Sequence, residues 1–298
     1  MYGTRSGVKI AHQLGPNALA GKTVVIVGGT DGIGAALARA AAMAGAKVTV
    51  VGRSLRTEVQ GVDFLKGDVS TMAECRSIVA RLPLEITDVL VFTAGIVPGS
   101  EREVTAEGIE KDMAVSALSR HVMIQAAAPR LPRTARVLVW GFPGAGMLKK
   151  SIIVDFNSET TYKAGFESTH ANTIALNEAL VHYWAARGMA IAGFNPGLIK
   201  TAIRGPLHGG GCLGGCIESI INCFNPSAEE YASRILPLFM APQLTTSKGL
   251  LFHQDGCSVI KPDAGFQNPA TVAEWITAAD RLVTKSAGPT TPATLIMS

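Results

Sequence analysis

The sequence predicts an α/β protein whose doubly wound parallel sheet lies between two helical layers, in a three-layer α/β/α arrangement. Thr23–Val27 is a run of five β-branched residues, typical of a short strand buried on both faces. A glycine-rich turn follows and leads into an Ala-rich helix. Short apolar strands then alternate with long helical stretches, which implies right-handed βαβ units. Together these observations indicate a Rossmann-like fold with ligands at the carboxyl ends of the strands.

The remaining elements follow in order along the chain. Further strands are expected at Lys47–Val51, Phe64–Val69, Val89–Phe92, Arg136–Trp140 and Met189–Phe194. Long helices are expected over about 106–128 and 161–186. We expect a basic, acid-free N-terminal arm at 1–20, a single domain at 21–285 and a loose tail at 286–298. A glycine-rich stretch near 204–227 suits either a mobile lid or a plain surface loop.

Composition narrows the class of protein. The 298 residues carry a net charge of +4 from 27 basic and 23 acidic residues, which is too balanced to indicate nucleic-acid binding. Apolar runs are too short for a membrane span, so we expect a soluble protein. The five cysteines are irregularly spaced, which favours a reducing, intracellular and cytoplasmic location, with organelle import left open. Cys212 and Cys216 lack a second ligand pair, so no metal site is predicted.

The glycine-rich turn is the predicted phosphate site. Gly28, Gly32 and Gly34 have no Cβ, so the backbone can turn tightly and approach a ligand. The helix expected from Ile33 would offer free N–H groups and its positive dipole end to a pyrophosphate. A tight strand-to-helix turn without a ligand is the alternative. Asp31 either caps this helix or places a negative charge near the phosphates.

The residues after the second strand indicate which nucleotide is bound. In dinucleotide folds, an acid about 20 residues past the glycines holds the ribose hydroxyls. Here the chain reads Gly52-Arg53-Ser54. Arg53 and Ser54 can bind a 2′-phosphate through charge-assisted hydrogen bonds, so we predict NADP(H) over NAD(H). The alternative is that Arg53 is a solvated loop charge.

Several motifs in this order resemble those of the short-chain dehydrogenase/reductase family. Val27–Gly34 matches the family's glycine motif, and Gly67-Asp68-Val69 is similar to its adenine-contact motif. Phe92–Gly95 matches the family's Asn-Asn-Ala-Gly segment at its last two positions, and Asn195–Thr201 resembles its Pro-Gly motif. The resemblance implies that the cofactor is lined by Gly28, Thr30, Gly32, Ile33, Gly34, Arg53, Asp68, Ala94, Gly95, Ile199 and Thr201.

The usual catalytic residues of that family are missing from the matching positions. Relatives use Asn, Ser, Tyr and Lys, and the tyrosine exchanges a proton with the substrate oxygen. By the family's spacing these positions fall on Ser116, Gly141 or Phe142, Phe166 and His170. Phe166 has no hydroxyl group and cannot exchange a proton. The resemblance therefore predicts a non-standard proton donor.

Three nearby residues are candidates for that donor. If residues 162–170 are helical, Tyr162, Phe166 and His170 share one face. Tyr162 is then about one turn, roughly 5.4 Å, from the usual place of the acid. Lys163 is the second candidate, and His170, which can titrate near neutrality, is the third. The alternatives are a packed Tyr162, a solvated Lys163 and a hydrogen-bonded helix histidine.

Three hypotheses on function remain open at this point. The first is an NADP(H)-dependent oxidoreductase acting on a small carbonyl or alcohol substrate with a displaced proton donor. The second is a cofactor-binding homologue without redox activity, acting as a sensor or partner subunit. The third is an enzyme of another class that holds the nucleotide as a structural element. The resemblance also implies a homo-oligomer built through the two long helices.

Overall fold

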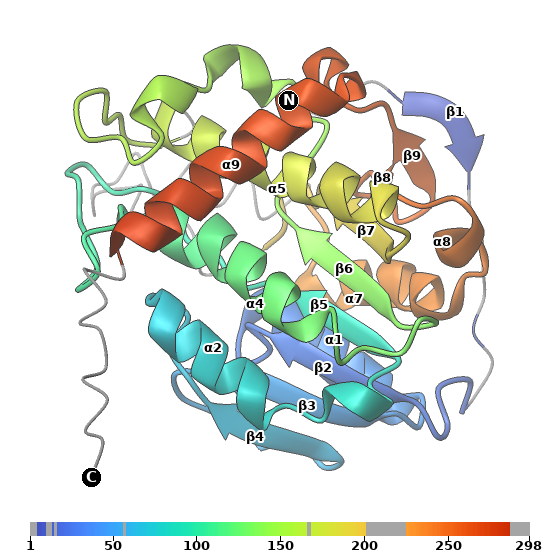
Figure 1. The fold of residues 1–298 in the computed structure, drawn as a ribbon. Coiled ribbons are helices and arrows are strands. Elements are labelled where there is room, and N and C mark those ends of the chain that lie inside the picture. Colours follow the sequence, from blue (N-terminus) through green and yellow to red (C-terminus); the bar gives the residue numbers. More distant parts are fainter. Residues whose placement is uncertain are drawn as a thin grey trace, which may run out of the picture.

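The computed structural model describes residues 5–9, 14, 17–55, 58–165, 168–200 and 225–286. In this part of the chain nine strands form one sheet in the order β1-β9-β8-β7-β6-β5-β2-β3-β4 (Figure 1). The strands from β4 to β8 along this order are parallel, while β9 runs antiparallel to β8 and to β1. The strands are β1 Arg5–Lys9, β2 Thr23–Val27, β3 Lys47–Gly52, β4 Val62–Lys66, β5 Val89–Phe92, β6 Arg136–Trp140, β7 Ala190–Phe194, β8 Leu250–Phe252 and β9 Ser258–Ile260.

The central strand β2 explains the layered architecture. All five of its residues are buried, and they alternate between the two sides of the sheet. Val25 and Val27 belong to the core under α2, α4, α5 and α9, whereas Val24 and Ile26 belong to the core under α1 and α7. The predicted three-layer Rossmann-like fold is confirmed.

The helices cover both faces of the sheet (Figure 1). On one face lie α1 (Gly32–Met43), α7 (Ala228–Ile235), η6 (Leu236–Met240) and α8 (Gln243–Thr246). On the other lie α2 (Met72–Arg81), α4 (Ser119–Ala127), α5 (Ser168–Ala186) and α9 (Pro269–Ser286). Before α4 come α3 (Lys111–Met113) and the π-helical turn η2 (Ala114–Leu118), and the short 3-10 turns are Leu84–Ile86, Met147–Lys150, Ile153–Asp155 and Ala264–Gln267.

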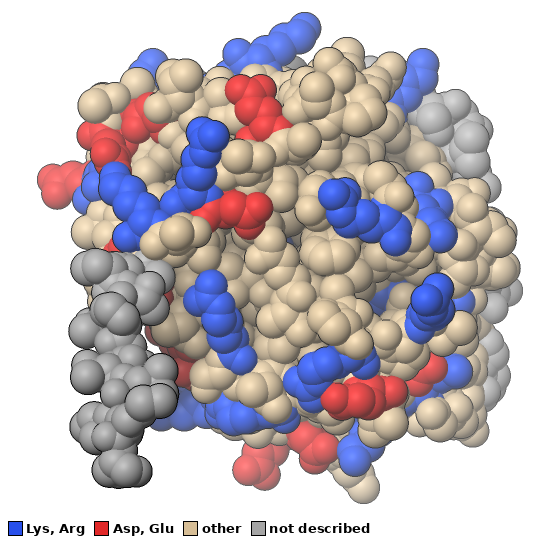
Figure 2. All heavy atoms as spheres, in the orientation of Figure 1, with Lys and Arg blue, Asp and Glu red and all other residues tan. Residues whose placement is uncertain are grey.

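None of the helices in the described part of the chain combines the length and apolar content needed to cross a bilayer. On the face that carries α9, α4 and α2, basic side chains are scattered with acidic ones between them (Figure 2).

Two predicted helices begin later than expected. The helix predicted from 161 begins at Ser168, because Gly165 adopts a left-handed φ of 70° and Asp155 holds the preceding loop. Its carboxylate accepts hydrogen bonds from the backbone N–H groups of Thr160 and Thr161 at 2.9 and 2.7 Å. Residue 162 is therefore not helical, so the condition under which Tyr162 and His170 would share a helical face is not met. The helix predicted from 106 begins at Lys111, where the Glu110 side chain caps it.

The remaining differences concern strand ends and the arm. The strand predicted at Phe64–Val69 lies at Val62–Lys66, whereas Arg136–Trp140 is found where it was predicted. Within the predicted N-terminal arm, Arg5–Lys9 forms the edge strand β1 on β9. Most of the predicted lid near 204–227, with Cys212 and Cys216, lies outside the described residues, as does the tail beyond Ser286.

Candidate cofactor and active site

The glycine turn after β2 is built by close backbone packing. Gly28 has φ 92°, and its N–H donates to Val51 O at 2.9 Å. A Cβ on Gly28 would lie 2.3 Å from the nitrogen of Ala94, and one on Gly34 would lie 2.2 Å from the carbonyl oxygen of Gly28. The glycines therefore let the turn, the start of α1 and the end of β5 meet, and this need exists with or without a ligand.

The start of α1 is capped by Asp31, one of the two predicted alternatives. Its carboxylate accepts from the N–H of Gly32 at 2.8 Å, and the helix begins at Gly32, one residue before the predicted Ile33. A helix leaves its first N–H groups without intrahelical partners, and here those of Ile33 and Gly34 follow the capped one. This helix start retains the geometry of an anion site, although its N-cap is an acid.

The predicted adenosine-side residues lie at the carboxyl ends of neighbouring strands. Arg53 and Ser54 follow β3 and are exposed. A Cβ on Gly52 would lie 2.6 Å from Thr30 Oγ1, so the loop that carries Arg53 packs against the glycine turn. Asp68 follows β4, is exposed, and accepts from the Ser70 N–H at 2.9 Å.

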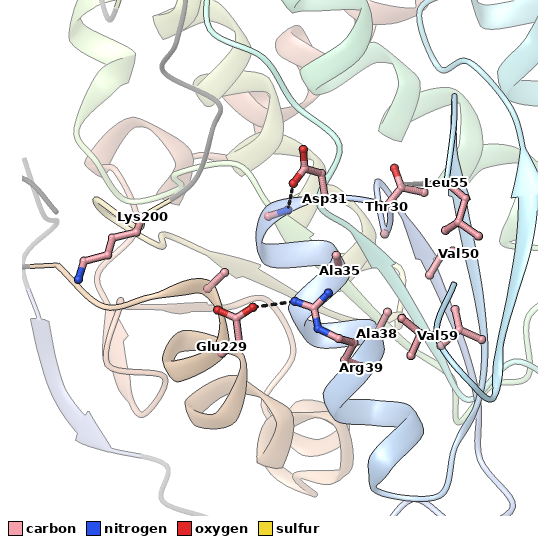
Figure 3. Close-up of a pocket in the computed structure, with 14 residues that line it drawn as sticks. Thr30, Asp31, Ala35, Ala38, Arg39, Val50, Leu55, Val59, Lys200 and Glu229 are labelled. Carbon is pink, nitrogen blue, oxygen red and sulfur yellow. Dashed lines mark hydrogen bonds and ion pairs between the residues drawn. The ribbon is translucent and has the colours of Figure 1, made fainter. Parts of the chain in front are cut away.

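A cavity of about 360 Å³ opens beside this turn (Figure 3). Thr30 and Asp31 line one end, and the ion pair between Arg39 of α1 and Glu229 of α7, at 2.7 Å, lies along it. It extends along α1 toward Val59, and Asp68 is not among its lining residues. The cavity therefore shares the glycine turn with the predicted cofactor site but does not contain all of it.

A second cavity, of about 110 Å³, lies at the carboxyl ends of β5, β6 and β7. Three of the predicted cofactor residues, Ile33, Gly95 and Ile199, line it. Ala94 borders this region and its carbonyl oxygen accepts a hydrogen bond from Arg120 at 2.7 Å. Thr201 lies outside the described residues. The structure thus gathers residues from four predicted motif segments at one end of the sheet.

Arg120 is a cavity-lining residue that sequence reasoning missed. It lies on α4, is 3% exposed, and its Nη1 donates to Asn177 Oδ1 at 2.6 Å and to the carbonyl oxygen of Ser116. Burial lowers the pKa of its guanidinium to about 9, while the charge of Asp112 raises it. The signal in the sequence was that Arg120 lies in a predicted helical stretch made mostly of apolar residues, which could have marked it as a buried arginine.

The position expected for the catalytic serine is shaped by Asn177 of α5. A Cβ on Gly141 would lie 2.5 Å from the Cβ of Asn177, so only glycine fits there. The next residue, Phe142, has φ 53° and lines the cavity. Ser116, at the expected asparagine position, accepts from the Ile96 N–H at 2.9 Å and so fixes the loop after β5.

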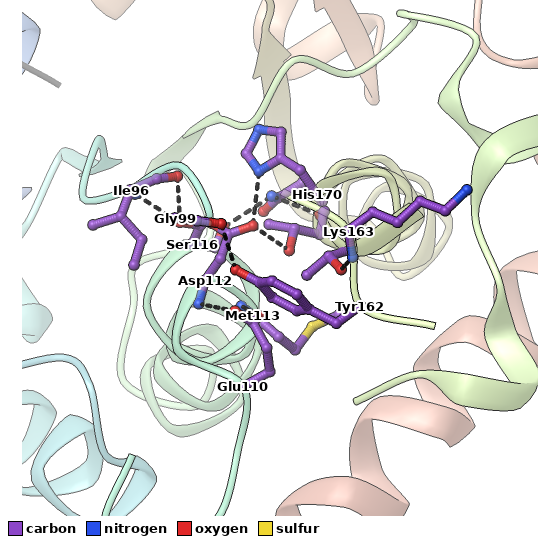
Figure 4. A network of polar contacts seen from close by, with 12 residues as sticks. Ile96, Gly99, Glu110, Asp112, Met113, Ser116, Tyr162, Lys163 and His170 are labelled. Carbon is purple, nitrogen blue, oxygen red and sulfur yellow. Dashed lines mark hydrogen bonds and ion pairs between the residues drawn. The ribbon is translucent and has the colours of Figure 1, made fainter. Parts of the chain in front are cut away.

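His170 forms a buried hydrogen-bonded pair with Asp112 (Figure 4). The Nδ1 atom of His170 lies 2.7 Å from Asp112 Oδ2, which also accepts from Thr173 Oγ1 at 2.9 Å. Asp112 is fully buried, and His170 is 4% exposed and lines the second cavity. With Nδ1 donating to the carboxylate, Nε2 becomes the basic nitrogen. Sequence reasoning had named His170 but not Asp112.

The other two predicted donors lie differently. The Tyr162 hydroxyl donates to Gly99 O at 2.8 Å, and burial, followed by the charges of Glu110 and Asp112, raises its pKa to about 12. Lys163 is exposed, and Figure 4 shows its side chain extending away from His170. Of the three candidates, only His170 is among the described residues that line the cavity. Phe166 lies outside the described residues.

The parallel sheet, the glycine turn at the start of α1 and the two cavities at the strand ends define a dinucleotide-binding protein of the Rossmann type. Comparison with known proteins narrows the class. A family model described as short chain dehydrogenase matches residues 22–139. An uncharacterized oxidoreductase of Saccharomyces cerevisiae is 39% identical over 251 residues, which cover 80% of each chain. The chain therefore belongs to the short-chain dehydrogenase/reductase family, whose members are oxidoreductases that use a nicotinamide nucleotide.

Other known proteins are similar to this chain at lower identity. L-fucose dehydrogenase of Mus musculus is 28% identical over 193 residues, which cover 61% of this chain and 67% of that protein. Among solved structures, levodione reductase has a TM-score of 0.61 at 17% identity, covering 80% of this chain and 97% of its own. The aldohexose dehydrogenase of Thermoplasma acidophilum has a TM-score of 0.59 at 17% identity, covering 81% and 96%. At these identities the two structures support the fold alone.

Proposed function

We propose that this protein is an NADP(H)-dependent oxidoreductase that interconverts a small carbonyl compound and its alcohol, with His170 as the proton donor. The observation that carries the proposal is the buried pair of His170 and Asp112 in the wall of the second cavity. A histidine held this way can give a proton to a substrate oxygen and take it back in the reverse direction.

The residues present fit a nicotinamide dinucleotide. Gly28 and Gly34 form a turn with no side chains in the way, and the start of α1 suits a pyrophosphate. Ile33, Gly95 and Ile199 line a cavity at the strand ends, where the nicotinamide would lie. When bound, the cofactor supplies or accepts the hydride.

The preference for NADP(H) rests on Arg53 and Ser54. Both are exposed directly after β3, where the preceding Gly52 packs against Thr30, and no carboxylate lies between Gly52 and Leu55. A guanidinium and a hydroxyl at this place favour a 2′-phosphate over a free ribose hydroxyl pair. NAD(H) is the less favoured cofactor.

The chain's own residues divide the work at the reacting end. Asp112 accepts a hydrogen bond from the Nδ1–H group of His170 and so fixes the orientation of the ring. The Thr173 hydroxyl donates a hydrogen bond to the same carboxylate oxygen. In the reductive direction, Nε2 of protonated His170 gives its proton to the substrate oxygen while carbon receives the hydride. In the oxidative direction, neutral His170 takes the proton back.

The test is a substrate screen with matched variants. NADPH oxidation is measured with aldehydes, ketones and aldose sugars, and NADP reduction with the corresponding alcohols, including L-fucose because a relative is named for that sugar. We expect His170→Gln to lower kcat/KM by about 100- to 10,000-fold, the usual contribution of a positioned acid or base, with NADPH affinity retained. Tyr162→Phe, which changes a hydroxyl outside the cavity, is the control and should retain activity.

Other outcomes would redirect the assignment. Loss of activity in Tyr162→Phe with His170→Gln unaffected would place the donor at Tyr162. If both of these variants retain activity, Lys163→Met tests the remaining candidate in the same assay. Clear NADPH binding without turnover on any panel would instead support a catalytically silent homologue acting as a sensor or partner subunit.

The resemblance implies a homo-oligomer built through the two long helices, whereas the position of α9 leads us to expect no association through α4 and α5. Helix α9 meets both of them, because Asp280 accepts from Gln125 of α4 at 3.0 Å and Trp275 and its neighbours share the core of α5. Association through that face would require α9 to move.

A further inference from the structure

Arg120 brings a positive charge to the wall of the second cavity, and no carboxylate is among its hydrogen-bond acceptors in the described part of the chain. Its side chain is 3% exposed, and its hydrogen-bond acceptors are the neutral oxygens of Ala94, Ser116 and Asn177. Among the described residues that line the cavity there is no aspartate or glutamate. The nearby acid Asp112 acts on Arg120 through its charge, but its printed hydrogen bonds are to His170 and Thr173 and not to the guanidinium. The guanidinium of Arg120 is therefore closer to the cavity than the carboxylate that acts on it, because Arg120 lines the cavity and Asp112 does not.

The guanidinium keeps donors that its neighbours do not use. It carries five N–H groups. Nη1 makes two hydrogen bonds and Nη2 makes one, and Nε is buried with no partner among the described residues. A Cβ on Gly95 would lie 3.7 Å from Nη2 and 3.4 Å from Ser116 Oγ. Because Gly95 lines the cavity and has no side chain, Nη2 is not screened from it there.

We propose that Arg120 makes this cavity distinguish the two redox states of the nicotinamide ring, and that the protein binds NADPH more tightly than NADP⁺. The oxidised ring carries a positive charge and the reduced ring is neutral. A guanidinium buried in the cavity wall repels the first and not the second, and the low-polarity surroundings strengthen this effect. The inference rests on the proposed function, since the nicotinamide ring must enter this cavity.

The consequence is a direction for the enzyme. A site that binds NADPH more tightly than NADP⁺ holds its cofactor mostly in the reduced state. This is the state that is needed for carbonyl reduction. Two like charges separated by about 10 Å in a partly buried site change a binding constant on the order of tenfold. That is the size of preference we assign to Arg120.

The test measures dissociation constants for NADPH and NADP⁺ by calorimetry, without any substrate. The wild type is expected to bind NADPH about tenfold more tightly than NADP⁺. Arg120→Met removes the charge and should bring the ratio of the two constants close to one, while Arg120→Lys keeps the charge and should preserve the ratio. Arg136→Met removes a half-buried arginine at the opposite end of β6 and should leave the ratio unchanged.

A second variant tests the same charge without removing the arginine. In Asn177→Asp, a carboxylate replaces the amide oxygen that accepts from Arg120 at 2.6 Å, so it neutralises the guanidinium in place. It should also bring the ratio of the two dissociation constants close to one, which keeps the test decisive if Arg120→Met fails to fold. An unchanged ratio in folded Arg120→Met or Asn177→Asp protein would overturn the inference. Failure of the wild type to bind either nucleotide would overturn the proposed function instead.

Discussion

At the residue scale, the two charged positions at the ends of the proposed cofactor site have separate roles. Arg53 lies at the exposed end of β3, whereas Arg120 is enclosed in the cavity wall. An exposed cation can select a phosphate that stays partly hydrated, and a buried one acts through its field. The two arginines should therefore respond to different changes in the nucleotide: Arg53 to the 2′-phosphate and Arg120 to the redox state of the ring.

Replacing Arg53 tests the first of these roles. We expect Arg53→Ala to weaken NADPH binding about tenfold with little effect on NADH, because only the 2′-phosphate loses a charge-assisted hydrogen bond. Fluorescence titrations with the two reduced nucleotides measure both constants. Lys47→Ala, which removes an exposed charge at the other end of β3, is the control. Equal losses of affinity for NADPH and NADH would show that Arg53 does not bind the 2′-phosphate.

Glu110 links the buried polar cluster to the pH dependence of stability. It is 2% exposed, and burial, followed by the charge of Asp112, raises its pKa from 4.5 to about 7. The folded state therefore holds a proton that the unfolded state releases. The stability from protonated Glu110 is fully present below pH 4.5 and is lost as the pH rises toward 7.

Replacing Glu110 with glutamine should remove that dependence. We expect the free energy of unfolding of the wild type to fall by roughly 2–3 kcal/mol across this pH window through Glu110. Glu110→Gln should flatten the fall, since the amide does not titrate. Urea unfolding on either side of the window measures the difference. Glu103→Gln, at an exposed carboxylate paired with Lys111, should behave as the wild type does.

Cavity-lining residues carried by backbone motifs could be named from the sequence, and those set by tertiary packing could not. Ile33, Gly95 and Ile199 lie in the cavity because glycine turns and strand ends fix their positions. Asp112 and Arg120 were not predicted, since most residues of their helical stretch are buried and no periodic polar face identifies them. Tyr162 was misplaced because the left-handed Gly165 ends the loop before the helix begins.

At the element scale, side-chain caps decide where the helices begin. Strands such as Arg136–Trp140 were predicted well because a run of apolar residues marks their length. The starts of α3 and α5 were not, since Glu110 caps the first and Asp155 organises the loop before the second. The π-helical turn Ala114–Leu118 has no simple sequence signal, yet it positions Ser116 and Arg120 at the cavity.

Helix α7 offers a direct measurement of such a cap. Ser227 accepts from the Glu230 N–H at 3.1 Å while the Glu230 carboxylate accepts from the Ser227 N–H at 2.8 Å, which is a complete capping box. We expect Ser227→Ala to cost about 1 kcal/mol in thermal or chemical unfolding. Ser233→Ala, within the same helix, should cost much less or stabilise it slightly. Equal effects from the two changes would contradict the role of the cap.

At the scale of the whole molecule, the C-terminal helix α9 closes one side of the protein. Its buried residues, Val272, Trp275, Ile276, Ala279 and Val283, recur at helical spacing and join the core of α4 and α5. Trp275 packs against Phe156 and Phe266 with ring centroids 5.6 and 6.3 Å apart. At its other side Asp280 lies 2.7 Å from His121 of α4. Helix α9 thus covers an apolar surface of α4 and α5 that would otherwise be exposed to another chain.

This arrangement predicts the oligomeric state. Two copies could pair through α4 and α5 only if α9 moved away. That movement would expose the five buried apolar residues of α9. We therefore expect the full chain to have the mass of one chain in light scattering after gel filtration, over a wide range of protein concentration. Trp275→Ala should lower the stability of the fold by about 3–5 kcal/mol and uncover this face, so the variant should associate, whereas Thr277→Ala on the outer side of α9 should stay monomeric. A stable wild-type dimer in which amide exchange of α4 and α5 slows on association would show that α9 yields this face to a second copy.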